Sequence, residues 1–159
     1  MGGVNGAEAL KALYALQEKD LEIDRLRAEA ESLPEELVAL QGQVETLEER
    51  LTNLLERRAE LEREYNRHSL DIEDLSAKEK QAEEEQKRAQ SAREQTQYEN
   101  RIQQIKDRIR ELLELSTPIM EAMENLEAEI AQVAEELAAL RPRLQELLEA
   151  NRARVAELE

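Results

Sequence analysis

The chain has 159 residues and a net charge of −16, with no Cys, Phe or Trp, three Tyr and a single His. So few aromatic residues leave little to fill a round hydrophobic core. The lack of cysteine excludes disulfides, and with one histidine it leaves no zinc site, so we expect no cofactor within these residues. The acidic total also disfavours binding of the whole chain to nucleic acid or to an anionic membrane.

Residues 1–6 are expected to form a flexible N-terminus, because three of them are glycine. Asn5 and Glu8 make a weak N-cap pair for a helix that begins near residue 7. This segment lacks the basic and apolar regions of a signal peptide, and no apolar run reaches the roughly 20 residues that span a bilayer. We therefore expect a cytoplasmic protein without a membrane partner.

A first helical arm is predicted over residues 7–88, because apolar residues from Leu37 onward follow alternating steps of three and four. Pro34 removes an intrahelical hydrogen bond, and Ser32 with Glu35 matches a capping box. We therefore expect a kink near Pro34, with helices over about 7–32 and 34–88 and a change of heptad frame between them. The apolar residues of this first seam are Leu37, Leu40, Val44, Leu47, Leu51, Leu54, Leu61, Tyr65, Ile72 and Leu75.

The hairpin turn is predicted at residues 89–92. Extending the first seam in heptads gives positions that are out of phase with the second seam, so the helix must be interrupted between them. Ser91 and Glu94 match a capping box that would begin a new helix, although no Gly or Pro is present. A single unbroken helix that dimerises in parallel is the alternative.

The second arm is predicted over residues 93–159, with possible kinks at Pro118 and Pro142. Because a narrow seam cannot bury itself, the two seams should pack together, which predicts an all-α fold: a long, kinked, antiparallel coiled-coil helical hairpin. This register leaves Leu10, Leu13 and Leu16 uncovered, and we expect a longer protein whose further part covers them. The second seam consists of Tyr98, Ile102, Ile105, Ile109, Leu112, Ile119, Met123, Leu126, Ile130, Val133, Leu137, Leu140, Leu144, Leu147 and Leu158.

Two segments resemble a known family. Residues 10–37 (LKALYALQEKDLEIDRLRAEAESLPEEL) and 93–114 (REQTQYENRIQQIKDRIRELLE) are similar to the opening and the hairpin tip of bacterial C4-type zinc-ribbon proteins. Glu94 and Tyr98, usually adjacent in that family, are separated here. The resemblance implies a kinked hairpin followed by a ribbon that binds zinc through two CxxC pairs, which this chain lacks. It also implies an adaptor, chaperone-like or regulatory role in secretion or transcription, and in some members RNA binding.

The expected hairpin tip is basic. Between Gln86 and Arg110 there are seven basic and three acidic residues, a net charge of +4, so the rest of the chain carries −20. We interpret this tip as a docking site for an acidic protein surface or, less favoured because only one aromatic residue is present for stacking, for RNA. A solvated face of mixed charge is the structural alternative. The predicted contact residues are Lys87, Arg88, Arg93, Tyr98, Arg101, Lys106 and Arg108.

Five polar residues fall on or near the seams: Asp20, Arg58, His68, Ser116 and Asn151. Such residues weaken a coiled-coil core but fix its register, and we predict that role for them. His68 could also respond to pH, and Glu64 with His68 could share a metal, but two ligands make no closed site.

A two-helix rod offers no pocket that separates the pKa values of paired carboxylates, and no phosphate-binding loop or catalytic triad is present. We therefore predict a protein that is not an enzyme. The favoured function is a coiled-coil interaction or adaptor module that presents its basic tip to protein partners. The alternatives are a structural spacer or dimerisation rod, and an RNA-associated regulator. The sequence leaves monomer and homodimer undecided.

Overall fold

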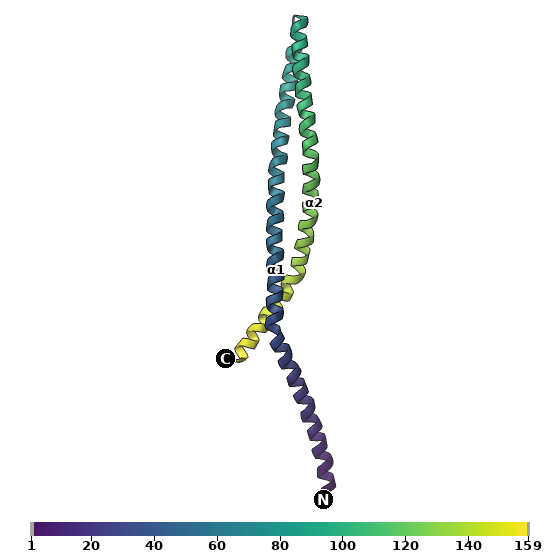
Figure 1. The fold of residues 1–159 in the computed structure, drawn as a ribbon, viewed down its shortest axis with the longest axis vertical. Helices are drawn as coiled ribbons and strands as arrows, with labels where there is room; N and C mark the ends of the chain where they lie inside the picture. Colours follow the sequence, from purple (N-terminus) through teal and green to yellow (C-terminus); the bar gives the residue numbers. More distant parts are fainter. Residues whose placement is uncertain (1, 159) are drawn as a thin grey trace. The chain divides into compact units, whose positions relative to one another are not determined.

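The computed structural model describes residues 2–158, apart from the side chains of residues 2–5 and 30. Two helices, α1 (Gly2–Lys87) and α2 (Ala92–Leu158), pack against each other as an all-α helical hairpin (Figure 1). The predicted fold class is therefore confirmed, and the alternative of one unbroken helix is wrong. By internal contacts the chain divides into two units, one comprising Met1–Glu48 with Glu136–Glu159 and the other comprising Glu49–Glu135, which contains the turn.

The two predicted heptad seams form the core of each unit. Every described seam residue from Leu37 to Leu75 on α1, and from Tyr98 to Asn151 on α2, is buried or half-buried, whereas Leu158 is exposed. The α1 seam also continues past Leu75 to the end of the helix and into the turn. The residues that continue it are small or polar: Glu79, Ala82, Gln86 and Ala89.

The turn occupies residues 88–91, one residue earlier than predicted. Ser91 caps α2 as expected, since its hydroxyl accepts a hydrogen bond from the Glu94 amide at 3.2 Å. The Glu94 carboxylate in return accepts one from the Gln90 amide at 3.3 Å. At the other side, the amides of Arg88 and Ala89 each bond a carbonyl three residues earlier, which tightens the last turn of α1. Within the described residues no backbone φ is positive, so this turn needs no glycine.

Pro34 lies inside α1, which continues through it. The predicted division into two helices is therefore wrong, although α1 is bent in its dark blue part, the region of Pro34 (Figure 1). Ser32 does not cap a new helix, because its hydroxyl donates to the Glu29 carbonyl at 2.9 Å. Leu33 and Leu37 are both packed, four residues apart, and no packed residue lies between 6 and 29, so the predicted change of heptad frame stays a prediction. Loss of one hydrogen bond does not end a helix that is long on both sides of the proline, because propagation adds a bond for each further residue.

α2 likewise continues through Pro118 and Pro142, and a kink at either proline stays a prediction. Around the first of them, Ser116 and Thr117 donate their hydroxyl protons to the carbonyls of Leu112 and Leu113, at 2.8 and 3.2 Å. Such bonds to the preceding turn supply partners to carbonyls in the region where a proline has removed a donor.

The start of α1 differs from the prediction. The helix begins at Gly2 rather than near residue 7, while the flexibility of residues 1–6 stays a prediction, and the proposed cap by Asn5 concerns a side chain outside the described ones. Glycine lowers helix stability by only about 1 kcal/mol and does not stop a long helix from propagating. Leu10, Leu13 and Leu16 are exposed, as the register predicted. Every other residue from 6 to 29 is exposed as well.

The packing contrast between Leu112 and Leu113 gives a first test of the hairpin core. Leu112 is 1% exposed and Leu113 is 53% exposed. Leu112→Ala should lower the free energy of unfolding by about 2–5 kcal/mol, because it leaves a cavity between the helices. Leu113→Ala should change it by about 0.5 kcal/mol or less. Urea unfolding followed by circular dichroism measures both, and equal losses would contradict this packing.

The cap at the turn gives a second test. Ser91→Ala removes the acceptor of the Glu94 amide and should cost about 1 kcal/mol in the free energy of unfolding. Ser91→Asp, which retains an acceptor, should recover most of that loss. The same urea experiment compares the three proteins, and an unchanged midpoint for Ser91→Ala would mean that the cap contributes nothing.

Candidate functional site

The basic residues near the turn differ in whether the chain already neutralises them. Lys106 pairs with Glu79 at 3.8 Å, and Arg108 pairs with Glu111 at 2.9 Å. Four others are exposed and form no ion pair with any residue that the structure describes. These four, which we name the turn cluster, are Lys87, Arg88, Arg93 and Arg101. All lie within about three helical turns of the loop, so their charges are available to a partner.

Tyr98 lies in the middle of the turn cluster. It is half-buried and lines two shallow surface depressions, one together with Arg88 and the other together with Arg101. Glu94 lines both depressions as well. Tyrosine and arginine are the residue types that carry much of the binding energy at protein interfaces. The arrangement therefore offers an aromatic side chain flanked by two guanidinium groups.

Acidic residues adjoin this cluster on α1. Glu83 and Glu84 are exposed, and Glu85 accepts a hydrogen bond from Gln81 at 3.2 Å. The end of the hairpin thus carries both signs of charge. A partner that matched this pattern would be oriented as well as attracted, since like charges brought together oppose the wrong alignment.

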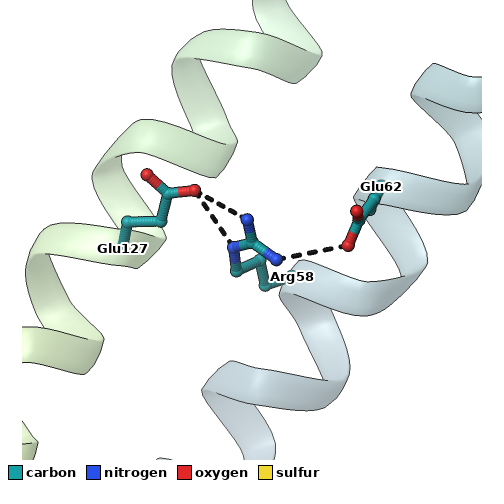
Figure 2. Close-up of polar contacts among 3 residues, drawn as sticks. All are labelled: Arg58, Glu62 and Glu127. Carbon is teal, nitrogen blue, oxygen red and sulfur yellow. Dashed lines mark hydrogen bonds and ion pairs between the residues drawn. The ribbon is translucent and has the colours of Figure 1, made fainter.

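Arg58 is the polar seam residue with the most contacts (Figure 2). Its Nε and Nη2 atoms donate to Oε1 of Glu127 on α2, at 3.1 and 2.8 Å, and its Nη1 atom donates to Glu62 at 3.2 Å. The hydrogen bond to Glu127 raises the pKa of the Arg58 guanidinium above its usual value, against a smaller opposing effect of burial. Arg58 therefore stays charged throughout the physiological range and ties the two helices at one level.

The other polar seam residues have different surroundings. Ser116 is buried, with its hydroxyl bonded to the Leu112 carbonyl. His68 is half-buried, and its Nε2 atom lies 3.9 Å from Glu64, too far for a hydrogen bond. Asn151 is half-buried, and its Oδ1 atom has no hydrogen-bond partner among the described residues. A register-setting role for these residues stays a prediction.

Asp20 does not belong with them. It is exposed, within the stretch of α1 whose described residues are all uncovered, so its predicted place near the helix interface is wrong. In the described structure no helix packs on that stretch, so Asp20 has no interface to occupy.

The described residues contain no group of three or more His, Cys, Asp or Glu side chains placed to hold a metal ion. Over residues 2–158, neither helix has an apolar stretch able to cross a membrane. No match to the chain was found among protein-family models, curated proteins or solved structures. The resemblance to zinc-ribbon proteins therefore stays a prediction.

Two features of the surface were not predicted from the sequence. Glu79 is a seam position that pairs across the helices with Lys106, and the heptad extension through position 79 was the signal that could have identified it. The second is an apolar surface that includes Leu113 and Met120, which lie off the seam and are 53% and 47% exposed. Exposed leucines in a coiled coil are common, so only the structure distinguishes this pair.

The bridge between Arg58 and Glu127 can be tested by reversing its charges. Arg58→Glu places a carboxylate against Glu127 and should lower the thermal midpoint of unfolding, because like charges then meet across the helices. Adding Glu127→Arg to that variant should restore much of the loss. Thermal circular dichroism of both single variants and the double variant gives the coupling, and strictly additive changes would exclude a direct interaction.

Proposed function

We propose that the chain is a non-enzymatic interaction module whose helical hairpin presents the turn cluster to protein partners in the cytoplasm. The observation that supports this most is the division among the basic residues near the turn. Those farther along α2 are held in ion pairs within the chain, whereas Lys87, Arg88, Arg93 and Arg101 are not. Unpaired cations on an otherwise acidic chain would attract an acidic patch on a partner.

The resemblance to bacterial C4-type zinc-ribbon proteins adds an adaptor, chaperone-like or regulatory role in secretion or transcription to this proposal. Zinc would then belong to a ribbon outside these residues, and we propose no cofactor within them. Tyr98, flanked by Arg88 and Arg101, would be the central contact.

A second candidate function is a dimerisation rod or spacer. It is favoured by the exposed apolar side chains on the N-terminal part of α1, which are between 46% and 69% exposed. Surfaces of this kind in soluble proteins commonly mark interaction sites. These residues are Leu10, Leu13, Tyr14, Leu16, Leu21, Ile23 and Leu26.

Charge reversal of the turn cluster tests the first candidate. A variant with Lys87, Arg88, Arg93 and Arg101 all changed to Glu should lose the partners that the wild type captures from bacterial extract, as quantified by mass spectrometry. Its helicity should be unchanged, because all four side chains are exposed. A control with Arg63, Arg67, Arg143 and Arg152 changed to Glu has the same net charge and should retain those partners.

Three outcomes separate the candidates. Equal capture by both variants would contradict docking through the turn. A dimeric mass in sedimentation, lost when Leu16 and Ile23 are changed to Glu, would favour the rod. Binding of a labelled single-stranded RNA that weakens steeply with salt, and is lost in the turn variant alone, would favour an RNA-associated regulator.

A further inference from the structure

Two shallow depressions adjoin on one side of the unit Glu49–Glu135, between α1 and α2. Tyr65 and Met120 line both of them, so together they form one continuous surface, which we name the side groove. The remaining residues that line it are Ser69, Ile72, Leu113, Ser116, Thr117, Met123, Glu124 and Glu127. Both helices contribute to it, and it lies away from the turn cluster.

The apolar part of the side groove extends beyond the residues of the core. Leu113 and Met120 lie outside the heptad seam of α2, yet they are two turns apart on one side of the helix, because seven residues make almost two full turns. Tyr65 and Ile72 have the same spacing on α1 and are half-buried. Apolar residues repeated at this spacing match the anchors of a helix that packs into a groove. Methionine adapts its shape to such a partner.

The rim of the side groove is acidic. Residues 111–135 of α2 contain seven glutamates and no basic residue. Glu124 lines the groove itself, and Glu114 and Glu121 share the face of α2 on which Thr117 lies. None of these three carboxylates forms an ion pair within the described part of the chain. A partner that fits this rim carries lysine or arginine beside its apolar face.

We propose that the side groove is a docking surface for a basic amphipathic helix of another protein. Its apolar face would cover Leu113 and Met120, and its cations would lie against Glu114, Glu121 and Glu124. This proposal is independent of the turn cluster, which would attract a partner of the opposite charge.

The chain supplies a matched control on another part of its surface. Leu70 is 64% exposed and lines a depression with Glu60, Arg63 and Arg67, where basic residues outnumber acidic ones, so a basic helix would not be attracted there. Leu55, also exposed, lies outside both depressions of the side groove. Alanine at these two leucines removes a similar amount of exposed apolar surface without touching the groove.

The probe is a fluorescently labelled leucine–lysine peptide of about 18 residues, five helical turns, with all leucines on one face. Its affinity for the full chain is measured by fluorescence anisotropy at physiological ionic strength, which screens attraction from distant charges. Leu113→Ala with Met120→Ala should raise the Kd about tenfold or more, the effect of losing roughly one buried apolar side chain. Glu121→Lys with Glu124→Lys should raise it as well, and Leu55→Ala with Leu70→Ala should leave it within about twofold.

A shuffled peptide of the same composition, without an apolar face, should bind at least about tenfold more weakly to the wild type. Methyl spectra of the wild type give an independent readout, because the chain has three methionines and two of them, Met120 and Met123, line the groove. Their signals should shift on binding. Equal affinity of the Leu113/Met120 variant and the wild type, or equal affinity for the shuffled peptide, would overturn the proposal.

Discussion

The structure depends on the burial of two narrow apolar seams, neither of which can be covered by its own helix. A seam with apolar residues every three or four positions buries its side chains only against a second helix of the same kind. The chain supplies that helix by turning back at residues 88–91, after which α1 and α2 cover each other level by level. Almost everything off the seams is therefore left to face solvent or a partner.

The fold could be predicted from the sequence because the apolar pattern of each seam repeats over many heptads. The side chains of Leu112, Val133 and Leu137, the most deeply buried, all occupy predicted seam positions. The turn was located to within one residue because Ser91 and Glu94 form a local motif whose hydrogen bonds do not depend on distant residues. Both signals are strong enough that tertiary context does not override them.

The errors have a common physical origin. Pro34, Ser32 and the glycines at the N-terminus were each given their usual local meaning, as breakers or caps, yet α1 continues through all of them. A local preference of about one to three kcal/mol is outweighed in a long helix, because each residue added after nucleation contributes a further hydrogen bond. Of the candidate site, the sequence predicted which residues near the turn are basic. It could not show that Lys106 forms an ion pair within the chain, since that pair joins Lys106 on α2 to Glu79 on α1.

The two exposed surfaces of the Glu49–Glu135 unit differ in chemistry in a way that follows from the seams. At the turn the seam residues are small or polar, such as Ala82, Gln86 and Ala89, so little apolar surface is available there. A partner that bound at the turn would therefore be held mainly by charge. In the side groove the seam residues are large, and Leu113 and Met120 extend the apolar area beyond the core. Contacts through charge at the turn would be fast to form and sensitive to salt, whereas contacts in the groove would be slow to break. If both proposals hold, the chain would bind two partners of opposite charge at separate places, and neither would require the hairpin to change its fold.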